Sequence, residues 1–96
     1  MSRLRQEEVL LAELRKAFGA DKRDFSAQSD WPSGVLILSK GRFRGIWCCR
    51  DGHYRGVWHW MDGNYAFTPG GYGNSTHAAP TPQDAVSFTL NHVCRQ

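Results

Sequence analysis

The 96-residue sequence has no apolar run long enough to span a membrane, and it begins with a charged stretch rather than a secretory signal. These two absences predict a cytoplasmic protein with no membrane contact. Cysteine is also scarce, with three residues, and two of them, Cys48 and Cys49, are adjacent. Neighbouring residues of a strand point to opposite faces, so we expect free thiols in a reducing compartment rather than a disulfide framework.

The motifs that usually hold a metal or a phosphate group are missing as well. The sequence has neither a Cys-x-x-Cys nor a His-x-x-x-His pair, and its glycine-rich run at 70–73 lacks the lysine of a phosphate-binding loop. Asp51 and Asp62 are better explained as turn residues than as paired catalytic carboxylates. We therefore predict no metal, no cofactor and no catalytic residue, and a binding protein is favoured over an enzyme.

What the sequence does contain is a repeat of eleven residues, whose three units begin at Gly41, Gly52 and Gly63. Aspartate precedes the second and third units, which gives Asp-Gly between stretches that alternate and are rich in aromatic residues. Asp-Gly in that setting is typical of the tight turn of a hairpin. The repeat therefore predicts an antiparallel β-meander in the middle of the chain.

The two ends of the chain show helical patterns. Apolar residues recur at helical spacing before Gly19, and Thr81 and Pro82 together make a typical helix start. We expect one α+β domain over residues 1–96, with a four-stranded antiparallel β-meander between two helices and the C-terminal helix packed on one face of the sheet. The expected elements are a helix at 3–18, a loop at 19–34, strands at 35–39, 42–49, 53–61 and 64–68, a loop at 69–80 and a helix at 82–93.

Strand alternation divides the side chains of the meander between two faces. One face is aromatic and includes Trp47, Tyr54 and Trp58, and the other is basic around Ile46 and Val57. Burial of the aromatic face is favoured because rings contribute the most apolar area and buried, unpaired guanidinium groups are costly. The reverse arrangement would expose the rings for stacking on bases. The exposed basic face would present Arg42, Arg44, Arg55, His53 and His59.

The charges favour a nucleic-acid partner. The net charge is +3, and residues 40–55 contain five lysines and arginines against Asp51 alone. Arginines on adjacent strands suit charge-assisted contacts to phosphates, although a solvated sheet face has the same alternation. We predict nucleic-acid binding through the five basic-face residues named above. The alternative is a protein-binding inhibitor or anti-defence factor of a phage or mobile element, and a homodimer is also compatible. The interface of this protein-binding alternative would use Trp58, Trp60 and Tyr72.

One resemblance points the same way. The run from Tyr54 to Val57, the turn at Asp62 and the helix start at 81–85 resemble the AP2 and integrase-type DNA-binding domain, over about residues 54–90. The resemblance implies a three-stranded sheet backed by one helix, with arginines laid into the major groove. Of the matching positions it implies such a role for Arg55. Basic residues usually follow in that family where this sequence has Trp58 and His59, and the N-terminal helix lies outside the pattern.

Overall fold

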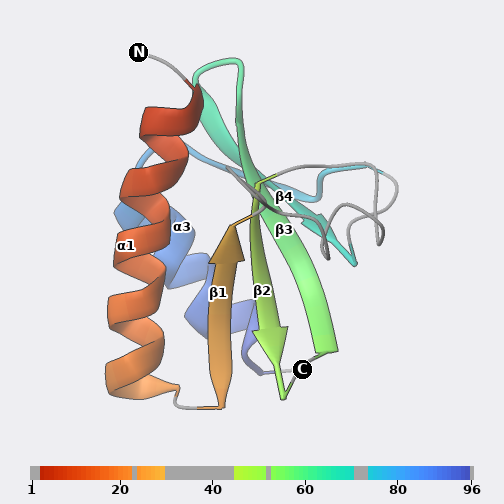
Figure 1. Ribbon diagram of the computed structural model, residues 1–96. Helices are drawn as coiled ribbons and strands as arrows, with labels where there is room; N and C mark the ends of the chain where they lie inside the picture. Colours follow the sequence, from red (N-terminus) through yellow and green to blue (C-terminus); the bar gives the residue numbers. More distant parts are fainter. Residues whose placement is uncertain (1–2, 23, 30–44, 52, 71–73, 96) are drawn as a thin grey trace.

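The computed structural model describes residues 3–22, 24–29, 45–51, 53–70 and 74–95. Its fold is α+β, with an N-terminal helix, a five-stranded antiparallel sheet in the order β1-β2-β3-β4-β5, and a C-terminal helical segment (Figure 1). The elements are α1 (Arg3–Asp21), β1 (Phe25–Ser29), β2 (Ile46–Arg50), β3 (His53–Met61), β4 (Asn64–Pro69), β5 (His77–Ala79), α3 (Pro82–Phe88) and the π-helical turn η1 (Thr89–Val93).

The sheet has five strands, and the prediction of four is therefore wrong. β1 lies within the segment 19–34 and β5 within the segment 69–80, both of which were expected to be loops. β1 pairs along its whole length with β2, and β5 pairs with β4 over three residues. The strand predicted at 35–39, and residues 42–44 of the strand predicted at 42–49, lie outside the described residues.

The turn chemistry anticipated from the sequence is present at the described positions. Asp62 and Gly63 form the two-residue turn between β3 and β4, with φ angles of 54° and 80°. Positive φ at both central residues is what this kind of hairpin requires, which explains the Asp-Gly pair. At the C-terminal segment the hydroxyl of Thr81 accepts a hydrogen bond from the backbone N–H of Asp84 at 3.2 Å, and Pro82 is the first helical residue.

An irregularity in the pairing of β2 with β3 sets the two faces of the sheet. Next to the turn Cys49 pairs with Tyr54, but beyond it Cys48 pairs with Gly56, so β3 carries one extra residue, Arg55. This is a β-bulge. It places Gly56 on the face opposite to Tyr54, although residues two positions apart in a regular strand share a face.

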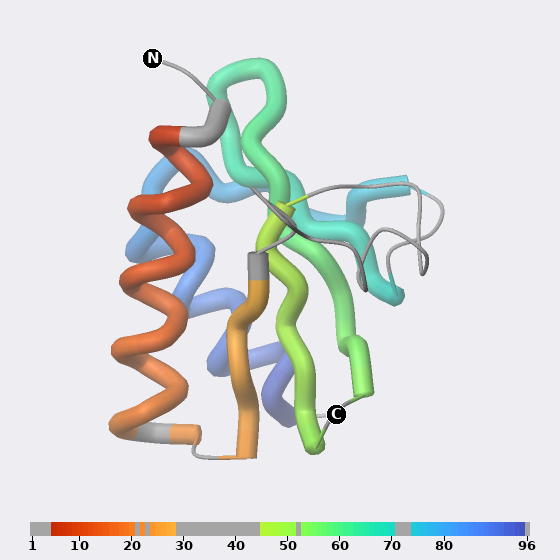
Figure 2. The backbone as a smooth tube through the Cα atoms, in the orientation of Figure 1, coloured from red at the N-terminus to blue at the C-terminus, as the bar shows by residue number. Residues whose placement is uncertain are grey.

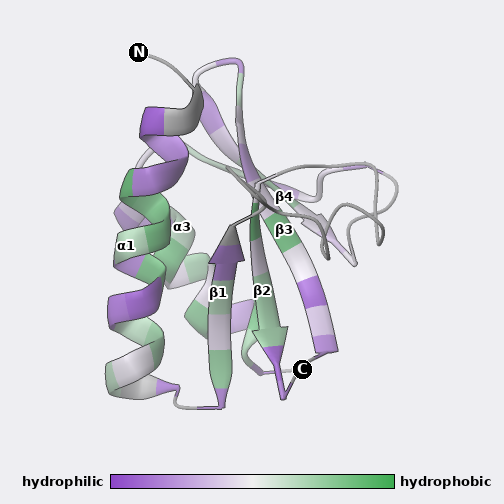
Figure 3. Ribbon diagram, in the orientation of Figure 1, coloured by the Kyte–Doolittle hydropathy of each residue, from purple (hydrophilic) through white to green (hydrophobic). Residues whose placement is uncertain are grey.

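Both helical segments pack against one face, which we call the helix-proximal face. Its buried residues from the sheet include Ile46, Cys48, Trp58, Tyr65 and Phe67, and they form one cluster with residues of α1 and of the C-terminal segment. Gly56 is required here, because a Cβ atom at this position would lie 2.2 Å from the ring of Phe67. Figure 3 shows that β2 is hydrophobic over most of its length.

The predicted division into faces is consequently corrected in part. Trp58, Tyr65 and Phe67 are buried beneath the helices, as expected, but Trp47 and Tyr54 lie on the opposite face. Ile46 was expected on the basic face and instead packs under the helices. The error begins at the bulge, because a change of one residue in register transfers every later side chain of a strand to the other face.

The N-terminal turn of α1 is fixed to the β3–β4 hairpin by two hydrogen bonds. The backbone N–H of Trp60 donates to the carboxylate of Glu7 at 2.7 Å, and the hydroxyl of Tyr65 donates to the carbonyl of Gln6 at 2.8 Å. Figure 2 shows the hairpin turn beside this end of the helix. Trp60 lies two residues beyond Trp58, where the described pairing with β2 ends. The buried carboxylate thus satisfies a strand N–H at a sheet margin.

A second buried polar chain fixes the C-terminal segment. The indole N–H of Trp58 donates to the hydroxyl of Thr89 at 2.9 Å, and this hydroxyl donates to the carbonyl of Ala85 at 2.7 Å. Thr89 is fully buried and begins the π-helical turn. Its hydroxyl is both donor and acceptor, so it serves the tryptophan and the helix together.

We expect Glu7→Ala to lower the free energy of unfolding by about 1–3 kcal/mol, because the N–H of Trp60 loses its acceptor in a buried setting. Urea denaturation measures the change. The matched control is Glu8→Ala, since Glu8 is the exposed neighbour on the same helix turn. Equal losses in the two variants would contradict the role of Glu7.

We expect Thr89→Val to destabilise the fold by about 1–3 kcal/mol, because the side chain keeps its shape but leaves the N–H of Trp58 without an acceptor. Thr89→Ser retains the hydroxyl and is expected to lose less. Urea unfolding followed by tryptophan fluorescence compares the two, and a valine variant as stable as the serine variant would argue against this hydrogen bond.

Candidate functional site

The face turned away from both helices, here called the helix-distal face, carries the candidate site. Register continuity along β3 and β4 places Arg55, Val57 and His59 on this face, and the bulge adds Tyr54. A small apolar cluster lies at its centre, in which Trp47, Cys49 and Val57 are buried and Tyr54 packs beside them. The rings of Trp47 and Tyr54 meet edge to face at 5.3 Å between centroids.

Arg55 stands at the bulge, where β3 has its extra residue. Its side chain is half-buried, and its Nε atom is buried without a hydrogen-bond partner in the described part of the chain. The carbonyl of Arg55 accepts a bond from the N–H of Gly70 at 3.1 Å, which fixes the backbone. Bulges often direct a side chain at a functional site. Arg55 therefore has a fixed backbone and an unsatisfied donor.

Trp47 lies on the neighbouring strand, directly opposite Val57. It is fully buried, and its indole N–H has no hydrogen-bond partner among the residues that the structure describes. Buried indole N–H groups usually have an acceptor, and leaving one unpaired costs about 1–3 kcal/mol. Trp47 was not predicted as a site residue. No sequence signal distinguishes it from a core tryptophan.

The histidines of the predicted basic face do not join Arg55 at the surface. His53 is exposed, but it pairs with Arg50, whose guanidinium lies over the ring of Phe25 on the helix-proximal side. The bulge therefore separates His53 from Arg55. His59 lies on the helix-distal face but is only 6% exposed, so little of its side chain is available for contact. Arg42 and Arg44 lie outside the described residues.

The three residues predicted for a protein interface lie in different surroundings. Trp58 is fully buried in the core of the described structure. Trp60 is half-buried and packs edge to face on Tyr65 at 4.8 Å. Tyr72 lies outside the described residues. The sequence pattern alone does not separate core tryptophans from surface tryptophans.

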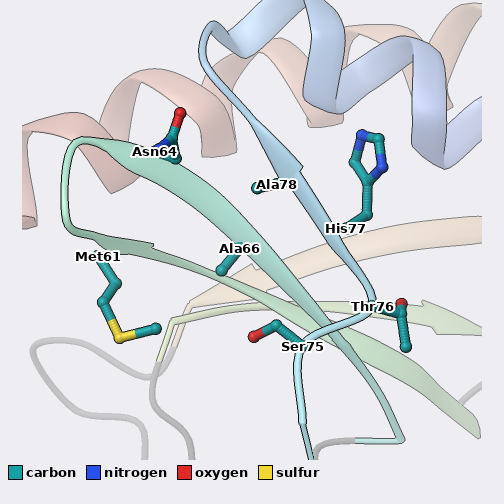
Figure 4. Close-up of a pocket in the computed structure, with 7 residues that line it drawn as sticks. All are labelled: Met61, Asn64, Ala66, Ser75, Thr76, His77 and Ala78. Atoms are coloured by element: carbon teal, nitrogen blue, oxygen red, sulfur yellow. The ribbon is translucent and has the colours of Figure 1, made fainter.

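A shallow hollow of about 380 Å³ lies where the tip of the β3–β4 hairpin meets β5. Figure 4 shows Met61 and Ser75 at this hollow, while the imidazole of His77 points toward the helices. Met61 is 47% exposed. The ring of His77 stacks on Phe88 at 4.0 Å. The hollow is therefore lined by small and apolar groups rather than by a catalytic set; its residues are Met61, Asn64, Ala66, Ser75, Thr76, His77 and Ala78.

The cysteine thiols are buried and poorly suited to chemistry. Burial raises the pKa of Cys49 to about 11, although a hydrogen bond with Ser26 lowers it, and burial also raises the pKa of Cys94 to about 11. Burial raises the pKa of Cys48 further, aided by the neighbouring thiols. The thiolate is the nucleophile and the metal ligand, so these groups are inert near neutral pH.

Metal and membrane features were sought within the described segments. There, no group of three or more His, Cys, Asp and Glu side chains is arranged to hold a metal ion. No helix among these residues combines the length and apolar character needed to cross a bilayer. Comparison of the chain with family models, with curated proteins and with solved structures gave no match.

We expect the stability of the protein to fall as the pH rises above about 9. Unfolded thiols ionise near 9.0, whereas Cys49 and Cys94 retain their protons to a pKa of about 11. The folded state therefore binds more protons between these values, and each thiol contributes a loss of up to about 1.4 kcal/mol per pH unit. Urea unfolding between pH 8 and 10.5 measures the slope. Cys49→Ala is expected to reduce that slope, and an unchanged slope would contradict the assignment.

Proposed function

We propose that the chain is a non-enzymatic nucleic-acid-binding protein that contacts phosphate through Arg55 on the helix-distal face. One observation carries the proposal: a half-buried guanidinium with an unsatisfied, buried Nε donor in the described part of the chain. Partial burial of an unpaired cation is costly, and an anionic ligand offsets that cost. A guanidinium fork matches the geometry of phosphate and carboxylate groups.

Other arginines of the described segments have internal roles that Arg55 lacks. The Nε atom of Arg50 forms an ion pair with Asp24 at 2.9 Å, and Arg15 donates to the carbonyl of Ala27 at 3.0 Å. The register places this carbonyl at the outer edge of β1 in the described part of the sheet, where a cation discourages pairing with another strand. These two arginines stabilise the fold, so Arg55 is the better candidate for a ligand contact.

The position of Arg55 also agrees with the resemblance to the AP2 and integrase-type domain. In that arrangement a helix backs the sheet and the arginines act from the opposite face. Here both helical segments lie on the helix-proximal face, and Arg55 lies on the other. Figure 3 shows β3 becoming hydrophilic toward its N-terminal end, where Arg55 is found.

A protein partner is the second candidate, favoured by the exposed Met61 at the hollow beside β5. Methionine is an adaptable apolar contact, and it stands at the tip of a hairpin held by α1. This function predicts that Met61→Ser weakens binding of a partner protein while Arg55→Gln does not. The nucleic-acid function predicts the reverse for a labelled oligonucleotide.

We expect Arg55→Gln to weaken binding of labelled duplex DNA, single-stranded DNA or RNA by about tenfold, since a charge-assisted contact is lost. The slope of log affinity against log salt is expected to fall by about one. Fluorescence anisotropy across a salt series measures both quantities, with circular dichroism as the check of folding.

The matched control is Lys16→Gln, which removes one exposed positive charge from α1. Arg55→Lys tests whether binding needs the planar guanidinium, because lysine keeps the charge but loses the planar set of donors. Equal effects of Arg55→Gln and Lys16→Gln would mean that only net charge matters. Failure of the unaltered protein to bind any of the three nucleic acids at low salt would refute the proposed function.

A further inference from the structure

We infer that Trp47 and Arg55 together form an anion site on the helix-distal face, which holds a phosphate group between the indole N–H and the guanidinium. The inference rests on the proposed function and makes it more specific, because it assigns the contact to the phosphate backbone rather than to base edges. Phosphate contacts position a protein on nucleic acid without reading its sequence.

The two residues stand on adjacent strands of the same face. Trp47 pairs with Val57, and Arg55 lies two residues before Val57 on the same face of the adjacent strand. Such diagonal neighbours are within reach of each other's long side chains. The edge-to-face contact with Tyr54, the residue next to Arg55, holds the ring of Trp47. The indole of Trp47 is therefore held in place, and the longer, charged side chain of Arg55 starts from a neighbouring position on the same face.

The chemistry of the pair calls for an acceptor. An indole N–H and a guanidinium can donate hydrogen bonds but accept none, so they cannot satisfy each other. Both Nε atoms are buried and unpaired within the described part of the chain. The described side chains of this face from β2 to β5 include no aspartate or glutamate, so the local charge is positive. An anion from outside is the complementary partner.

The two residues differ in depth, which gives the site an orientation. Trp47 is fully buried, whereas Arg55 is half-buried and retains some contact with solvent. A phosphate group approaching the sheet meets the guanidinium first, and the side chains over the buried indole N–H have to shift before one of its oxygens reaches that donor. A phosphate has several acceptor oxygens and can accept from both donors at once.

The test is a titration followed by ¹H–¹⁵N correlation spectra of the indole N–H groups in the full chain. The chain has four tryptophans, and Trp58 supplies an internal reference because its N–H already donates to Thr89. Inorganic phosphate and a short single-stranded oligonucleotide are the two probes, with acetate as the control anion. We expect the signal of Trp47 to move with both probes while that of Trp58 stays in place.

Arg55→Gln is expected to weaken the response of Trp47 to phosphate at least tenfold, since the charged half of the site is lost. Resonance assignment in the unaltered protein identifies Trp47 independently of any variant, and Trp47→Phe, which keeps an aromatic ring and removes the N–H, confirms it. The inference would be overturned if neither probe shifts the Trp47 signal. It would also be overturned if phosphate shifts this signal equally well in Arg55→Gln.

The two proposals fail in different ways. If the oligonucleotide binds and Arg55→Gln weakens it while the Trp47 signal is unmoved, the nucleic-acid function stands and the anion site is refuted. If phosphate moves the Trp47 signal but no nucleic acid binds, the site stands as a receptor for free phosphate groups and the proposed function is refuted.

Discussion

The extra residue in β3, opposite Cys48 and Cys49, is the constraint on which the two faces of this sheet depend. Next to the turn the strands follow the register of a two-residue hairpin, and past the bulge they are offset by one. Tyr54 is thereby held against Trp47, while Gly56 is turned to the helices, where the ring of Phe67 occupies the space that a side chain would need. One backbone irregularity thus separates the packed core from the candidate site.

The helix-proximal face depends on polar contacts as much as on apolar burial. Glu7 is 1% exposed, yet its carboxylate accepts the N–H of Trp60, and Thr89 connects the indole of Trp58 to the C-terminal segment. These bonds specify where each helix sits along the sheet, which apolar contact alone does not do. A rigid sheet is also what a binding residue needs, because the position of Arg55 is only as fixed as the strands around it.

The sequence predicted those parts of the fold that depend on local signals. Helical periodicity, the cap at Thr81 and the Asp62–Gly63 turn are properties of neighbouring residues, and the structure has each of them. β1 and β5 depend on pairing with other segments of the chain, so the local pattern predicts loops there, and the bulge depends on how β2 and β3 pack against each other. At the candidate site, alternation correctly placed Arg55 beside Val57 but could not reveal that Trp47 would join them.

Two tryptophans of the same sheet differ in whether their indole N–H has an acceptor. Trp58 and Trp47 are both fully buried, on opposite faces. The N–H of Trp58 has an acceptor in Thr89, whereas that of Trp47 has none in the described residues, and the Nε atom of Arg55 shares this condition. In the proposed function a bound anion would offset the cost of these two donors, and it would approach from the side opposite the helices.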